Sequence, residues 1–212
     1  MKTITLLLTI LLVSLSVYSQ DEKYQKTMSQ TIALMDNASV SDDYLTCASQ
    51  FERIALAEKT KWIPFYYASI SLIIMSFDEP DGDQRDQLLD RAQQLLDQAL
   101  ELAPGESELH VLQAFLYPSR ILVDPMGRGM LYMEKIFVSL ERAKALNPDN
   151  PRIYFLEGVN KLNLPPSMGG GAEAAKPILE EASAKFEAFH NEDPLWPGWG
   201  EDDNKAELDK LQ

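Results

Sequence analysis

Three stretches of this chain repeat one helical pattern, and that pattern limits the folds that the chain can adopt. In each stretch, apolar residues stand at positions i, i+4 and i+7, which share one helix face, and a proline five residues later ends the helix. The three sets are Ala92, Leu96, Ala99 and Pro104; Ile136, Leu140, Ala143 and Pro148; and Ala182, Phe186, Phe189 and Pro194. This repetition indicates a helical repeat protein.

The pattern resembles the second helix of a tetratricopeptide repeat, a helix-turn-helix unit of about 34 residues. The first helices of the units fit the same family, because Ala114 and Gly158 supply the small residue that lets two helices approach closely. The spacing is longer than in the family, since Pro104, Pro148 and Pro194 are 44 and 46 residues apart. We therefore expect extra residues between the two helices of a unit.

The extra residues predict two long loops, Tyr117–Gly129 and Asn163–Gly171. The whole sequence predicts nine helices and no strand, and Asn150-Pro151 marks one helix start clearly, as an N-cap residue followed by proline. The expected fold is all-α, an antiparallel stack of tetratricopeptide-like helix pairs over residues 42–194, whose ends are capped by the first and last helices. Such a fold says little about activity.

The N-terminus predicts export. Lys2 precedes an apolar run, Ile4–Val17, that is shorter than the roughly 20 residues that span a bilayer. Small residues end this run, so we expect a signal peptide over residues 1–19, cleaved between Ser19 and Gln20 and leaving one domain over residues 20–212. A cut after Gln20 and an uncleaved anchor are the alternatives. The one cysteine, Cys47, lies far from the end of this run, which argues against a lipid anchor and for a free periplasmic or extracellular protein.

Charge narrows the class of partner. The chain has 19 Lys and Arg against 33 Asp and Glu, a formal net charge of −14. Such a protein repels phosphate backbones and anionic lipids, so we expect no nucleic-acid binding and no stable membrane insertion after cleavage. The pattern does not predict an oligomeric state.

Candidate chemistry is sparse. His110 and His190 have no spacing that supports a metal site or a catalytic dyad, and no hydrolase, redox or phosphate-loop motif is present. The acidic turn Asp78–Asp83 suits a helix cap, with a cation site as the alternative. The run Pro165–Gly171 suits a tight turn, with anion binding as the alternative. We therefore expect no enzyme, no cofactor and no resident metal.

Aromatic residues give the stronger indication of function. They fall on the expected first helices of the units, which line the concave face of a tetratricopeptide stack, where some would be core and others peptide anchors. The candidate partner-binding residues are Trp62, Tyr66, Tyr67, Tyr117, Tyr132 and Tyr154. The segment Pro194–Gly200, rich in tryptophan and proline, is expected to plug the last repeat. The primary prediction is a scaffold that binds a protein or peptide segment.

Three arginines suggest a second function. Arg120 and Arg128 lie in the expected 117–129 loop, and Arg152 begins a later helix. They predict either an ion pair with Asp124 that pins the loop or a pocket for an anionic ligand. The alternative prediction is thus a small-ligand-binding accessory protein with an arginine-lined pocket under that loop.

The mature chain also resembles small exported tetratricopeptide-like proteins of Bacteroidetes. The resemblance rests on Phe51–Ala55 with Trp62–Ala68, on Asn150–Arg152 and on Gly169–Gly171. It implies a helical repeat fold and a periplasmic setting, and it assigns no active residue.

Overall fold

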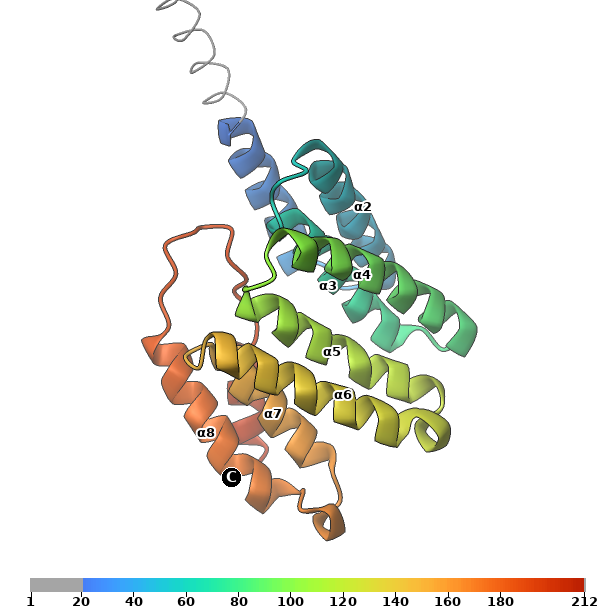
Figure 1. The fold of residues 1–212 in the computed structure, drawn as a ribbon, viewed down its shortest axis with the longest axis vertical. Coiled ribbons are helices and arrows are strands. Elements are labelled where there is room, and N and C mark those ends of the chain that lie inside the picture. Colours follow the sequence, from blue (N-terminus) through green and yellow to red (C-terminus); the bar gives the residue numbers. More distant parts are fainter. Residues whose placement is uncertain (1–20, 212) are drawn as a thin grey trace, which may run out of the picture.

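The computed structural model describes residues 21–211, so the expected signal peptide over residues 1–19 and its cleavage site lie outside the described residues. The described part is all-helical and contains no strand, as expected (Figure 1). Its first helix covers residues 21–36. The elements that follow are α2 (Ser41–Ala57), α3 (Ile63–Asp78), α4 (Gly82–Leu102), α5 (Ser107–Val123), α6 (Pro125–Leu146), α7 (Pro151–Asn163), the 3-10 turn η1 (Pro166–Met168), α8 (Ala172–Ala188) and α9 (Glu201–Asp209). Within residues 21–211, no helix is both long and apolar enough to cross a membrane.

Consecutive helices pack against each other and build an elongated stack (Figure 1). One hydrophobic core joins the first helix to α2–α5, and a second joins α5 to α6–α9. Phe115, Tyr117 and Trp199 pack against both cores. The two cores therefore belong to one continuous domain.

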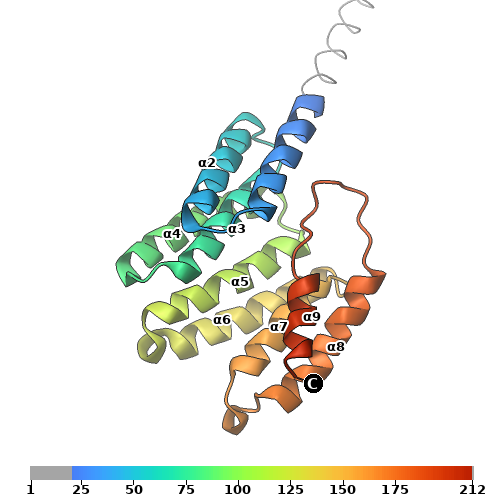
Figure 2. The same cartoon turned by 180° about the vertical axis from the view of Figure 1, so that it is seen from behind.

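The segment between α8 and α9, residues 189–200, is here called the C-terminal segment. This segment packs beyond the last helix pair, because it runs back toward the first half of the stack (Figure 2). Tyr67 donates a hydrogen bond to the Leu195 carbonyl (3.1 Å), and the Trp199 indole N–H donates to the Tyr66 hydroxyl (2.6 Å). The segment thus fills the inner side of the stack between α3 and α7.

The predicted loop over residues 117–129 is wrong. Helix α5 continues through Pro118 to Val123, and α6 begins at Pro125, with Asp124 as the single residue between them. The helix continues past Pro118 because one of its faces is still buried against the stack after the proline. On this face, Ser119 accepts a hydrogen bond from Ser76 of α3 (2.8 Å). Asp124 caps α6 by accepting from the Gly127 N–H (3.0 Å).

Two predictions about small residues are confirmed. A Cβ at Gly158 would lie 2.5 Å from Cδ2 of Leu179, so glycine is what lets α7 and α8 approach each other. A Cβ at Gly170 would lie 2.3 Å from the Leu164 carbonyl oxygen, which shows how tightly the chain turns after α7. Asn150 caps α7 as expected, accepting from the Arg152 N–H (3.0 Å).

Arginine–carboxylate pairs join α4 to the α5–α6 hairpin. Asp86 of α4 contacts Arg120 (2.7 Å) and Arg128 (2.7 Å), and Arg120 also contacts Asp90 (2.5 Å). The hydrogen bond from Arg128 is the main cause that holds the pKa of Asp86 below its usual value, against the opposing effect of partial burial. The arginines are pinned, as one sequence prediction proposed, but by Asp86 and not by Asp124.

We predict that Gly158→Ala lowers the free energy of unfolding by about 1–3 kcal/mol, because the new methyl group must displace Leu179. Urea unfolding measures the effect. Gly105→Ala is the matched control, since a Cβ there meets no atom within 4 Å, and we expect little change from it. Equal stability of the two variants would show that the α7–α8 contact tolerates a methyl group.

We also predict a pH-dependent stability effect at Asp86. Because its pKa is lower folded than unfolded, its contribution is complete above the ordinary value of 3.8 and disappears as pH falls through the folded value. Asp86→Asn should therefore reduce the free energy of unfolding by about 1–3 kcal/mol above about pH 5, and the difference from wild type should vanish in acid. Glu101→Gln, an exposed change at the other end of α4, is the control. A deficit that persists unchanged in acid would contradict the ion-pair explanation.

Candidate functional site

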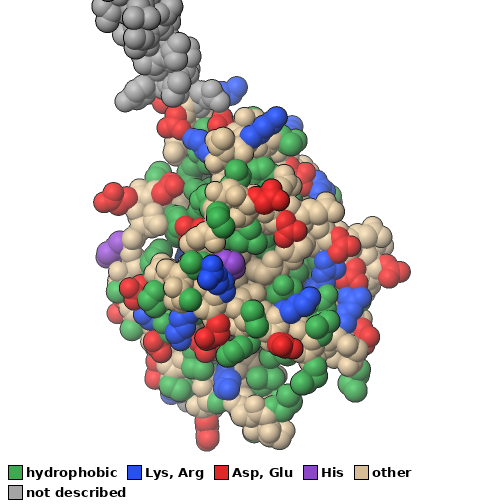
Figure 3. Space-filling view, viewed as in Figure 1, with side chains coloured by type: hydrophobic (Ala, Val, Ile, Leu, Met, Phe, Trp, Pro, Cys, Tyr) green, Lys and Arg blue, Asp and Glu red, His purple; other side chains and the backbone are tan. Residues whose placement is uncertain are grey.

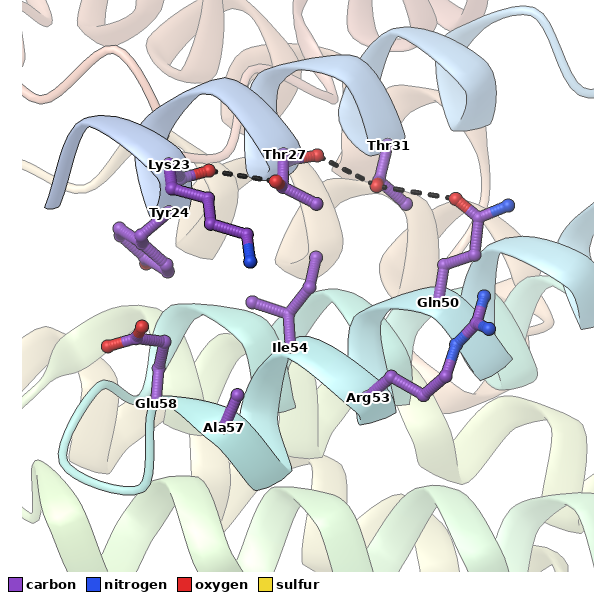
Figure 4. A pocket seen from close by; sticks show the side chains of 9 residues that line it. All are labelled: Lys23, Tyr24, Thr27, Thr31, Gln50, Arg53, Ile54, Ala57 and Glu58. Carbon is purple, nitrogen blue, oxygen red and sulfur yellow. Dashed lines mark hydrogen bonds between the residues drawn. The ribbon is translucent and has the colours of Figure 1, made fainter. Parts of the chain in front are cut away.

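A pocket of about 420 Å³ lies between the first helix and α2 (Figure 4). We call it the N-terminal pocket. Both helices and the turn after α2 contribute to its wall, which is formed by Lys23, Tyr24, Thr27, Thr31, Gln50, Arg53, Ile54, Ala57 and Glu58. Its volume is in the range of pockets that hold small molecules.

The pocket exists because of how the first helix presents its side chains. Tyr24, Met28 and Thr31 follow the i, i+4, i+7 pattern and are buried against the rest of the stack. The neighbouring positions, Lys23 and Thr27, are therefore turned to the flank that faces α2 (Figure 4). A lysine and a threonine therefore line the space between the two helices.

The wall is more apolar than its residue types indicate. The hydroxyls of Thr27 and Thr31 donate to carbonyls one turn earlier in their own helix, at 2.8 and 2.9 Å. Since these hydroxyls are satisfied, the threonines offer mainly their methyl groups to the pocket. Ile54 and Ala57 of α2 complete an apolar floor.

Two cations flank this floor without partners. Figure 4 shows Lys23 reaching from the first helix toward α2 and Arg53 rising from α2, with Ile54 between them. Neither side chain forms an ion pair or a side-chain hydrogen bond with the described part of the chain, whereas nearby Lys61 pairs with Asp21 (2.6 Å). In a chain of net charge −14, unpaired cations beside an apolar pocket suit a ligand with anionic groups.

The pocket has few side chains that could bind a metal ion. None of its nine lining side chains is a histidine, cysteine or methionine. Burial raises the pKa of the Tyr24 phenol, and the charges of Asp193, Glu58 and Asp21 raise it further, so the phenol stays protonated. The arrangement can therefore hold an amphipathic molecule by its apolar body and its anionic groups, with no strong ligand for an iron atom.

The aromatic residues expected to bind a partner lie mostly inside the protein. Tyr66, Tyr67 and Tyr154 are buried, and the hydroxyls of the first two bond to the C-terminal segment. Trp62 is partly buried and contacts Trp196 of the same segment edge to face (centroids 5.5 Å apart). The chain's own residues thus occupy the inner side of the stack.

The remaining candidates form separate clusters. The rings of Tyr117 and Tyr132 pack together with their centroids 5.4 Å apart, and the Lys135 ammonium lies above both rings. Arg120 and Arg128 meet at Asp86, but Arg152 is buried beside Glu108 (3.6 Å), so the three arginines do not form one pocket.

The other candidate sites from the sequence, His110 and the acidic turn Asp78–Asp83, have packing and capping roles in the fold. His110 is half-buried and burial lowers its pKa, in keeping with a packing role. In the acidic turn, Asp81 caps α4 by accepting from the Gln84 N–H (2.9 Å). Across residues 21–211, no group of three or more His, Cys, Asp or Glu residues is placed to hold a metal ion.

Sequence reasoning did not identify the N-terminal pocket. Lys23 and Arg53 lie 30 residues apart on different helices, and neither belongs to a motif. The available signal was the buried pattern of Tyr24, Met28 and Thr31, which places Lys23 beside the packed face of the first helix and not on its fully solvated side.

No family model and no curated protein matches the chain. Among solved structures, the HusA haemophore from Porphyromonas gingivalis superposes with a TM-score of 0.80. The two sequences are 30% identical, and the match covers 89% of this chain and 92% of HusA. The chain therefore belongs to the same protein family as the HusA haemophore.

Proposed function

We propose that this protein is an exported, non-enzymatic carrier that binds haem in the N-terminal pocket. The observation that carries the proposal is the apolar floor flanked by two unpaired cations, Lys23 and Arg53. The family relationship supports the choice of ligand, since HusA is a haemophore. This function corresponds to a small-ligand-binding protein, with the pocket at the start of the chain and not under residues 117–129.

Haem fits the chemistry of the pocket in two respects. Its flat porphyrin is apolar and gains about 25 cal/mol for each Å² that Ile54, Ala57 and the Tyr24 ring remove from water. Its two propionates are anionic and match Lys23 and Arg53. Arg53 is exposed, so its ion pair adds at most about 1 kcal/mol, and the apolar contacts supply most of the affinity.

Export remains part of the proposal and rests on the signal-peptide pattern of residues 1–19. The described part of the first helix starts at residue 21, which lies after the expected cut between Ser19 and Gln20. Cleavage there would leave every lining residue of the pocket in the mature protein. The mature protein would then bind its ligand in the periplasm or outside the cell, and the ligand would not have to enter the cytoplasm first.

The scaffold that binds a protein or peptide segment has less support. Its best anchors, Tyr66 and Tyr67, hydrogen-bond the C-terminal segment, which a partner would first have to displace. Neither residue is more than 3% exposed. We therefore place the binding function at the N-terminal pocket.

We predict that reversing both pocket charges, Lys23→Glu with Arg53→Glu, weakens haem binding at least about 10-fold, because the propionates would meet like charges. Absorbance titration of the purified protein measures the dissociation constant. The matched control is Lys26→Glu with Lys59→Glu, which changes the net charge equally on the same part of the chain, at exposed positions outside the pocket. An equal loss of haem affinity in both variants would mean that overall charge causes the effect. No loss of affinity in either variant would mean that haem does not bind in this pocket.

We further predict that binding does not depend on iron. Because no histidine, cysteine or methionine lines the pocket, iron-free protoporphyrin IX should bind within about 3-fold of haem. Quenching of tryptophan fluorescence measures both ligands in the same way. A loss of 10-fold or more without iron would reveal an iron ligand and move the site elsewhere.

A further inference from the structure

Helix α6 exposes an unusual row of thioethers at its start. Met126, Met130 and Met133 stand at i, i+4 and i+7, so they share one helix face. Met126 is 96% exposed and Met130 is 77% exposed. The apolar residues that bury α6 in the stack are Ile136, Leu140 and Ala143, which lie further along the helix. Met126 and Met130 therefore contribute little to folding, whereas Met133 is partly buried against the second core.

A fourth methionine faces this row from a different element. Met168 ends the turn η1, and with Met130 and Met133 it lines a groove of about 370 Å³. We call this the methionine groove; its other lining residues are Leu131, Glu134 and Leu164. Met126 lies one turn before it on α6. Figure 3 shows hydrophobic side chains gathered on the part of this face that α6 covers.

The turn that carries Met168 has a fixed shape. The Gly169 N–H donates to the Pro166 carbonyl (2.9 Å), and the Gly171 N–H donates to the Lys161 carbonyl (3.0 Å). Gly170 is pressed against Leu164, with no room for a side chain. Met168 is therefore held opposite α6 by the backbone and does not depend on a flexible loop.

This donor set selects one class of ligand. Thioether sulfur is a soft, neutral donor that favours Cu(I) over hard or divalent cations. Glu134 is the one carboxylate in the lining, which suits a monovalent ion and is too little for calcium or magnesium. Soft donors from two elements around one groove match the low coordination number that Cu(I) accepts.

We infer that the methionine groove is a Cu(I) site, with Met130, Met133 and Met168 as ligands and Met126 at its rim. The inference does not rest on haem binding, because the two sites share no lining residue. In Figure 1 the turn η1 lies at the other end of the stack from the first helix and α2. Binding moves no electron and needs no other reactant, since the ion enters and leaves as Cu(I).

The test is competition for Cu(I) against a chromophoric chelator under reducing conditions, with the purified protein. We expect one Cu(I) per chain. The triple change Met130→Leu, Met133→Leu and Met168→Leu should weaken binding at least about 10-fold, because leucine keeps the apolar shape and removes the sulfur. Met75→Leu, a partly buried methionine of α3 outside the groove, is the control and should bind Cu(I) as wild type does.

Two further measurements keep the inference falsifiable. Urea unfolding should show that the triple variant is as stable as wild type, since Met130 and Met168 are exposed and the third change is conservative. Its haem affinity should also be unchanged. Undiminished Cu(I) binding by the triple variant, or no Cu(I) binding by wild type, would overturn the inference. A loss of haem binding with Cu(I) binding intact would overturn it as well and assign the groove to haem.

Discussion

The stack depends on one buried carboxylate. Glu108 has no solvent exposure, and a charge in that position is costly unless its partners surround it. Tyr66 of α3 donates to it (3.0 Å), Asn150 at the start of α7 donates to it (2.8 Å), and Arg152 lies 3.6 Å away. Because these partners come from different helices, the carboxylate holds α3, α5 and α7 in one relative position.

The same network determines which surfaces remain free to bind. Arg152 donates to the Pro197 carbonyl and lies 5.4 Å from the Trp199 ring, while the Trp199 indole bonds to Tyr66. The C-terminal segment is thus attached to the partners of Glu108 and covers the inner side of the stack. Opening that side for a peptide would expose a charged network built for burial. The two sites that we propose lie where the network does not reach, at the first helix and at the start of α6.

Features that depend on neighbouring residues in the sequence were predicted correctly. Features that depend on contacts between distant residues were predicted wrongly. The start of α7 at Asn150-Pro151 and the close approach at Gly158 follow from the residues themselves, and both are confirmed. A loop was expected from Tyr117 to Gly129, but helix α5 continues through Pro118, where Ser119 contacts Ser76 of α3. Nothing near Pro118 in the sequence shows that contact. The partner of Arg120 was likewise placed nearby in the sequence, although Asp86 is 34 residues away. The N-terminal pocket combines two helices with no shared motif, so only the fold reveals it.

The position of the N-terminal pocket at the end of the stack gives it a further property. Helices in such a stack are stabilised by their neighbours, and the first helix contacts Gln50 of α2 and Ser71 of α3 through its Thr31 and Met35. Neither of these contacts involves Glu108 or its partners Tyr66, Asn150 and Arg152. The salt bridge between Lys61 and Asp21 is exposed enough to break at little cost. The two walls of the N-terminal pocket are thus held to each other without the Glu108 network that fixes α3, α5 and α7.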